Sequence, residues 1–133
     1  MHLERVADSG TPVAVCSRSN LVTDAGLPPA EALLERTTVA LGTDDVMLNG
    51  PSMFREMAFV AKLYDLEATT VLRTATAAGA EVAGLEFGVI EPGRPAGLVV
   101  LDGDSDNLAG ARDPVRAVVH RAGVGDVKRV LLG

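Results

Sequence analysis

Aromatic side chains are scarce in this sequence, which has three phenylalanines, one tyrosine and no tryptophan among its 133 residues. Any hydrophobic core must therefore be built from alanine, valine, leucine and methionine. The single cysteine, Cys16, excludes an internal disulfide and fits a reducing cytoplasm. No apolar run is long enough to span a bilayer, and the residues after Met1 form no apolar signal segment, so the sequence predicts a cytoplasmic protein.

Positive charge is also in short supply. The chain has 12 lysine and arginine residues against 18 aspartate and glutamate residues, which leaves a formal net charge of −6. This charge favours solubility and argues against a nucleic-acid backbone or an anionic membrane surface as the main partner. Aliphatic side chains are abundant instead: 47% of the residues are hydrophobic, enough for the core of one ordinary globular domain.

The first half of the chain alternates strands with helices. The pattern predicts a short helix over residues 3–7, a strand over 13–16, a helix over 30–36 and a strand over 39–41. Strand, helix and strand joined by short links form a βαβ unit, in which the two strands run parallel. Each strand is followed by polar residues, and α/β proteins place their chemistry at the carboxyl ends of such strands.

The second half begins with helices and ends with predicted strands. Helix-start residues stand at 51–52, and apolar side chains recur at helical spacing over residues 53–64. A second helix is capped by Asp65 and is weakened or ended at Gly79 or Gly84. The remaining pattern predicts strands over 98–101, 115–122 and 127–132, with an acidic loop over 102–114. The last third is thus predicted to be a small β module without a helix.

Four short motifs, in order along the chain, carry a resemblance to a known family. They are CSRSN at residues 16–20, GTD at 42–44, MFREM at 53–57 and GVIEPGRPA at 88–96. Together they resemble the carboxyl-terminal part of a metal-dependent amidohydrolase. The branch they resemble is the chlorohydrolase and aminohydrolase-like one, which includes nucleobase and related deaminases. The resemblance implies a hydrolase of carbon–nitrogen (non-peptide) or carbon–chlorine bonds.

The resemblance also implies a fold. Members of the family have an α/β fold, a (β/α)8 barrel joined to a β-sandwich that is built from both chain ends. Residues 13–16 and 39–41 would be the last two barrel strands, residues 1–87 part of the barrel, and residues 88–133 the carboxyl-terminal segment of the sandwich. The first six barrel strands have no counterpart, so we expect a truncated remnant, one piece of a split enzyme, or a misplaced gene start.

Three site residues follow from the same resemblance. Asp44 matches the family's aspartate, which binds a divalent metal, zinc or iron, and takes a proton from the attacking water. A metal lowers the pKa of its bound water, and an adjacent carboxylate can accept the proton. Ser19 and Asn20 match a serine–asparagine pair that shapes the substrate pocket. The alternative for Asp44 is a loop-capping carboxylate with no role in chemistry.

The family's metal-binding histidines have no counterpart here. Of the two histidines in the chain, His2 is interpreted as a solvated helix residue and His120 as an ordinary strand residue. One aspartate cannot make a catalytic zinc site, which takes three or more protein ligands. The chain alone is therefore predicted neither to hold the metal tightly nor to hydrolyse a substrate.

Three smaller departures from the family pattern involve single positions. Many deaminases of this branch carry a histidine where Val15 stands, which weakens the case for deamination. Ser17 stands in place of a proline and Gly97 in place of an aspartate, so loop rigidity is left open at both positions.

Two functions from different classes stay open. In the first, an upstream barrel chain supplies the missing histidines, and the complex acts on a small-molecule substrate. In the second, the chain is a non-catalytic remnant or interaction module that pairs with a second copy or another protein through unpaired strand edges. The missing strands also predict exposed apolar faces on residues 13–16, 39–41 and 53–61.

Overall fold

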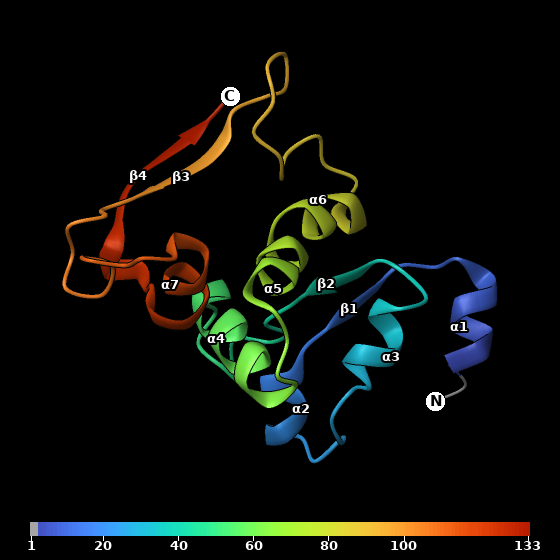
Figure 1. Cartoon of the computed structure of the whole chain (residues 1–133). Coiled ribbons are helices and arrows are strands. Elements are labelled where there is room, and N and C mark those ends of the chain that lie inside the picture. The colour runs from blue at the N-terminus through green and yellow to red at the C-terminus, as the bar shows by residue number, and fades with distance from the viewer. Residues whose placement is uncertain (1–2) are drawn as a thin grey trace.

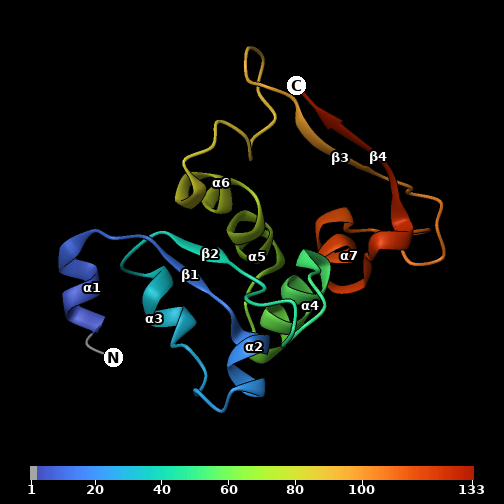
Figure 2. The same cartoon turned by 180° about the vertical axis from the view of Figure 1, so that it is seen from behind.

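The computed structural model describes residues 3–133, and the interpretation of His2 lies outside them. Its elements are, in order, α1 (Leu3–Ser9), β1 (Val13–Val15), α2 (Ser17–Val22), α3 (Ala30–Leu34), β2 (Val39–Leu41), α4 (Met53–Leu63), α5 (Ala68–Ala75), α6 (Ala77–Ala83), β3 (Gly97–Leu101), α7 (Pro114–Arg121), the 3-10 turn η1 (Val124–Asp126) and β4 (Val127–Leu132). Two separate pairs of strands, β1–β2 and β3–β4, lie on either side of helices α4, α5 and α7 (Figures 1 and 2). Among these residues, no helix is both long and apolar enough to cross a lipid bilayer.

The first pair of strands confirms the predicted βαβ arrangement. β1 and β2 run parallel, with Val13 opposite Val39 and Val15 opposite Leu41. The polar residues after β1 form helix α2, with Cys16 in the N-cap position. The loop that follows β2 then leads to α4.

Helix α4 begins and ends close to the predicted residues. The Ser52 hydroxyl accepts a hydrogen bond from the backbone N–H of Arg55 (3.4 Å), which makes Ser52 the N-cap of the helix. The predicted cap at Asp65 is wrong, because α5 begins after Glu67. The single helix predicted after Asp65 is instead two helices, α5 and α6, which meet at Thr76. Gly84, one of its two predicted ends, does end α6, in the left-handed conformation with φ of 67°.

The predicted strand over residues 115–122 is also wrong: these residues form helix α7. The Asp113 carboxylate accepts a hydrogen bond from the backbone N–H of Arg116 (2.9 Å), and Pro114 follows at the first helical position. An aspartate N-cap followed by proline is a strong helix start. The β-branched Val118 and Val119 favoured the strand interpretation, but tertiary packing overrides that propensity. His120 therefore lies on a helix, not on a strand.

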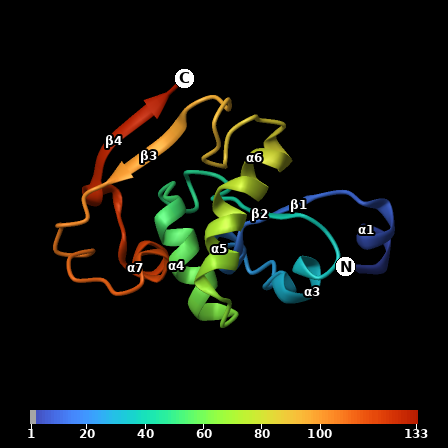
Figure 3. The ribbon, with the colours of Figure 1, turned by 45° about the horizontal axis from the view of Figure 1, so that its top comes forward.

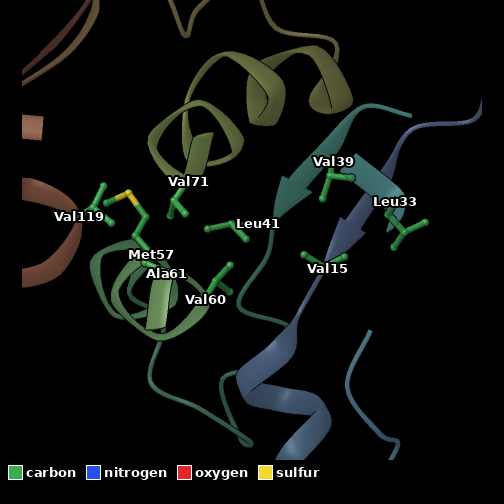
Figure 4. Close-up of a cluster of buried hydrophobic side chains, with 9 residues drawn as sticks. All are labelled: Val15, Leu33, Val39, Leu41, Met57, Val60, Ala61, Val71 and Val119. Atoms are coloured by element: carbon green, nitrogen blue, oxygen red, sulfur yellow. The ribbon is translucent and has the colours of Figure 1, made fainter. Parts of the chain in front are cut away.

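One hydrophobic core joins α7 to the rest of the molecule. Figure 4 shows its fully buried members, which come from β1, β2, α3, α4, α5 and α7: Val15, Leu33, Val39, Leu41, Met57, Val60, Ala61, Val71 and Val119. Val119 of α7 is 0% exposed and packs beside α4 and α5. The division of the chain at residues 87 and 88 stays a prediction, and α7 contributes to the core of the preceding residues.

The predicted exposure of apolar faces is wrong for β2 and α4, whereas in β1 Ala14 is exposed and Val13 is half-buried. All three residues of β2 are buried, and Met57 and Val60 of α4 are 4% and 2% exposed. Helices α5 and α6 pack on β2, and α4 packs against α5 and α7, so these faces are covered within the chain. Unpaired strand edges are present as expected, because each of the two sheets in residues 3–133 has only two strands.

The exposed apolar surface lies elsewhere, on the β3–β4 pair, whose two strands are separated in the sequence by α7 and η1. The strands are antiparallel, and the pair extends beyond the helices in all three ribbon views (Figures 1, 2 and 3). Val99, Val130 and Leu132 are 57%, 54% and 82% exposed. The two pairs of strands thus differ sharply in how much of their apolar surface the chain covers.

Candidate functional site

The carboxyl ends of β1 and β2 meet at one edge of the parallel pair. The backbone N–H of Gly42 donates to the carbonyl oxygen of Val15 (3.0 Å), which continues the ladder one residue beyond β2. Ser19 follows β1 within α2, and Asp44 follows β2 in the next loop. The parallel pairing therefore brings together two polar residues that are far apart in the sequence.

Ser19 and Asp44 are in direct contact. The Ser19 hydroxyl donates a hydrogen bond of 2.6 Å to Oδ2 of Asp44. Ser19 is only 1% exposed, whereas Asp44 is exposed. A short hydrogen bond to a carboxylate is stronger than one between neutral groups, and here it fixes the orientation of one carboxylate oxygen. The exposed position of Asp44 leaves the carboxylate open to a further group.

The backbone at Asp44 is in a conformation that few non-glycine residues adopt. Its φ is 59°, in the left-handed region, which costs about 1–2 kcal/mol for an L-residue. Asp24 and Asp65 share this conformation, because aspartate tolerates it better than most residues. At Asp44 the left-handed turn coincides with the side-chain contact to Ser19. Strain together with a directed carboxylate is typical of functional positions.

Gly42 allows the loop to approach the end of β1. A Cβ atom at Gly42 would lie 2.9 Å from Sγ of Cys16, closer than real contacts allow. Burial, followed by the negative charges of Asp44 and Glu56, raises the pKa of the Cys16 thiol. The thiol is therefore protonated at neutral pH, and Cys16 serves as a packing residue beside the site.

Asn20 makes a different contact. Its side-chain amide donates to the carbonyl oxygen of Gly26 (2.9 Å), which closes the loop after α2. The structure thus brings Ser19 to Asp44, while the amide group of Asn20 is directed to the loop. The substrate-binding role of Asn20 stays a prediction.

A buried ion pair lies beside the site and was missed by the sequence analysis. Arg18 donates to Oε1 of Glu56 (2.8 Å), and Glu56 is 1% exposed. Burial raises the pKa of Glu56, although the charge of Arg18 opposes the shift. One sequence signal was available: Glu56 interrupts the apolar face formed by Met53, Met57 and Val60 on α4.

The described residues do not fit a catalytic metal by themselves. No group of three or more histidine, cysteine, aspartate or glutamate residues in 3–133 is placed to hold an ion. Asp44 is one suitable ligand, but His120 lies on α7, where it lines a shallow cavity of about 470 Å³ with Arg112 and Arg116. We therefore derive no chemical step through a metal from this chain's residues alone.

Comparison with known proteins identifies the family. The model of the amidohydrolase family matches residues 1–133, so the chain belongs to that family. A 5-methylthioadenosine/S-adenosylhomocysteine deaminase from Haloarcula marismortui is 35% identical over 139 residues, with 97% of this chain and 32% of the relative covered. The chain spans about a third of the length of the curated relatives that it matches.

Solved structures agree with this assignment. An adenosine deaminase from Xanthomonas campestris with bound zinc has a TM-score of 0.89 and 32% identity, with 98% of this chain and 32% of that chain covered. Atrazine chlorohydrolase from Arthrobacter aurescens, complexed with zinc, has a TM-score of 0.84 and 26% identity, with 98% and 32% covered. These likenesses are consistent with part of a (β/α)8 barrel and with a divalent metal in the family. They do not confirm the sandwich assignment of residues 88–133.

Proposed function

We propose that this chain forms the carboxyl-terminal part of a metal-dependent hydrolase that acts on carbon–nitrogen bonds other than peptide bonds. The observation that carries the proposal is the 2.6 Å hydrogen bond from Ser19 to Asp44 at the carboxyl ends of two parallel strands. Active sites of barrel enzymes lie at this edge. Family membership and the likeness to zinc-containing enzymes support the reaction class.

Asp44 is the acid of the proposed site, as a ligand of zinc or iron and as the acceptor of a proton from water. Ser19 orients its carboxylate, and Asn20 shapes the substrate pocket by holding the loop at Gly26. A catalytic metal needs about three protein ligands, of which this chain offers one. The other ligands are therefore supplied from outside the 133 residues, and the chain alone is inactive.

The partner in this proposal is a complementing barrel chain, and the substrate is a small molecule with a hydrolysable amine. One relative is named as a 5-methylthioadenosine/S-adenosylhomocysteine deaminase, so 5-methylthioadenosine is a suitable first probe. Atrazine is the second probe, because a chlorohydrolase is also similar to this chain. Val15, which stands where many deaminases have histidine, makes the comparison of the two probes informative. The cytoplasmic location stays a prediction.

The test begins with the DNA immediately upstream of this gene, which we expect to encode the missing barrel strands and histidines. The two polypeptides are co-purified, zinc and iron are measured by mass spectrometry, and ammonia or chloride release is followed with the two probes. We expect about one metal per complex and release by the complex alone. The absence of both metals from the complex would contradict the proposal.

Asp44→Asn in the complex tests the role of the acid directly. We expect the rate to fall about a hundredfold or more, because loss of a positioned proton acceptor has effects of that size. Asp24→Asn is the matched control. Asp24 has the same left-handed backbone conformation, but it lies after the carboxyl-terminal end of α2. Equal rates for the two variants would show that Asp44 does not have the proposed role.

The alternative function is a non-catalytic interaction module that pairs with a second copy. The observation that favours it is the exposed apolar surface of Val99, Val130 and Leu132 on the β3–β4 pair. Light scattering of the purified chain distinguishes the two functions. A dimer with no complementing reading frame upstream would favour the module, and a monomer that assembles with the upstream polypeptide would favour the hydrolase.

A further inference from the structure

We propose that Glu56 is a positioning residue for the Ser19–Asp44 pair and that it acts through Arg18 and Asn49. The inference rests on the proposed function for the assignment of Asp44 as the site's acid. It starts from a buried polar network that joins α2, the loop after β2 and helix α4. No residue of this network matches the family's metal or substrate positions considered above.

The guanidinium of Arg18 connects the three segments. Its Nη1 donates to Oε1 of Glu56 on α4 (2.8 Å), and its Nη2 donates to Oδ1 of Asn49 (3.3 Å). Arg18 precedes Ser19 in the first turn of α2, and Asn49 lies in the loop that runs from Asp44 to α4. The donor Ser19 follows Arg18 directly, and the acceptor Asp44 precedes Asp45, whose carbonyl oxygen accepts from the backbone N–H of Asn49 (3.2 Å). Both partners of the Ser19–Asp44 hydrogen bond are thus connected to the carboxylate of Glu56.

The side chains of this network are largely buried, which restricts the conformations that they can adopt. The Glu56 side chain is 1% exposed and that of Arg18 is 17% exposed. Buried atoms Oε2 of Glu56 and Nδ2 of Asn49 have no hydrogen-bond partner in the described residues. A buried charge that loses its partner is strongly destabilising, so Arg18 and Glu56 have few alternative arrangements.

Stability alone does not account for an acid at this position. Glu56 lies within the apolar face of α4, where a hydrophobic side chain of similar volume is often at least as stable as a buried ion pair. A fixed arrangement is what the ion pair adds, because the fork of donors on arginine sets direction as well as distance. In this chain, the ion pair would fix the relative orientation of the two segments that carry Ser19 and Asp44.

Amide hydrogen exchange in the 133-residue chain tests the inference without any need for activity. The informative amides are those of Leu48 and Asn49, which donate to the carbonyl of Asp45 within the site loop. Glu56→Ala removes the acceptor of Arg18, and we expect exchange at both amides to rise about tenfold or more. Glu56→Gln keeps an acceptor oxygen of the same reach, so it should restore most of the protection.

Reference amides separate positioning from general loss of stability. Val71 in α5 and Ala117 in α7 donate to Glu67 and Asp113 and lie outside the network. Their exchange should change much less than that of the site loop in Glu56→Ala. An equal rise at all four amides, or no rise in the loop, would overturn the inference. Glu91→Ala is the matched control, because it breaks an exposed ion pair with Arg94.

The thiol of Cys16 supplies a second readout within the site. Glu56→Ala and Glu56→Gln both remove the negative charge that helps to raise the pKa of this thiol. Any difference between the two variants in the rate of alkylation by iodoacetamide therefore reports on loop position and not on charge. We expect at least about threefold faster alkylation in Glu56→Ala than in Glu56→Gln. Equal rates would count against positioning, and neither readout depends on whether the chain belongs to an active hydrolase.

Discussion

The two pairs of strands in this molecule are both rich in aliphatic residues but lie in different environments. Val39 of β2 is 3% exposed, whereas Val99 of β3 is 57% exposed. Helices α5 and α6 cover β2, whereas no element of residues 3–133 covers the apolar side chains of the β3–β4 pair to a comparable extent. The polar residues that follow β1 and β2 are therefore held in defined positions, because the hydrophobic core fixes the segments that carry them.

The largest expected effect is the loss of a core side chain from the covered pair. Leu41→Ala should lower the free energy of unfolding by about 2–5 kcal/mol, because it leaves a cavity among packed residues. Leu132→Ala on β4 is the control and should change it by less than about 0.5 kcal/mol, since Leu132 is 82% exposed. Urea denaturation measures both. Similar losses would show that the β3–β4 pair is as well covered as β2.

A smaller effect is expected where the chain approaches itself at the site. Gly42→Ala places a Cβ atom 2.9 Å from Sγ of Cys16, and we expect a loss of about 1–3 kcal/mol from overpacking. Gly125→Ala, near the start of β4, meets no atom within 4 Å and should be nearly neutral. The same denaturation experiment applies, and a neutral Gly42→Ala would mean that the loop has room to move.

The two regions should also respond to pH with opposite sign. Burial raises the pKa of Glu56 above its ordinary value of 4.5, so the folded state holds this proton more tightly than the unfolded state. Stability from Glu56 should therefore fall as pH rises from 4.5 through the folded pKa. Urea midpoints measured over a series of pH values should show this fall for the unmodified chain and not for Glu56→Gln. The same dependence on pH in both proteins would contradict the prediction.

Asp126, which directly precedes β4, behaves in the opposite way. The neighbouring Ser105 hydroxyl, and hydrogen bonds from the Gly123 N–H (2.7 Å) and the Asn107 side chain, lower the pKa of Asp126 below its ordinary value of 3.8. Its contribution is present above pH 3.8 and should be lost as pH falls through the folded pKa. Asp126→Asn should abolish this acid-side loss in the same series, whereas a persistent loss would assign it to another carboxyl group.

The smallest effect on stability is expected on the surface of the β3–β4 pair. Val130 is 54% exposed, so Val130→Thr should change the free energy of unfolding by less than about 0.5 kcal/mol. If the β3–β4 pair mediates association between copies, the same change should weaken the dimer in sedimentation experiments. Self-association that does not respond to Val130→Thr would place the contact elsewhere.

Much of the fold was predictable from local patterns. Short aliphatic runs identified β1 and β2, and an N-cap with regular apolar spacing identified α4. Helix α7 was not predicted, because Val118 and Val119 favour strands while the signal at Asp113 and Pro114 is local and short. Burial of Val119 in a core shared with α4 and α5 favours the helix. The contact between Val119 and these helices cannot be read from the sequence.

The candidate site was predictable to a similar extent. Motif order pointed to Ser19, Asn20 and Asp44, and the structure joins Ser19 to Asp44 while the Asn20 amide closes a loop. Arg18 and Glu56 were overlooked as a pair, since nothing local indicates that an arginine after one strand meets an acid on a later helix. The sequence thus named candidate residues, which stay predictions as site residues, whereas the contacts between them came only from the structure.

The sequence by itself determined the family, the parallel pair of strands and the acid that follows the second strand. Each of these depends on residues close together in the chain: a short motif, an alternation of elements, or a glycine before a turn. Only the tertiary structure decided that β2 is covered while β3 is exposed, that Ser19 holds Asp44, and that Arg18 reaches Glu56. Burial and long-range hydrogen bonds depend on which segments meet in space, and local sequence patterns do not specify that.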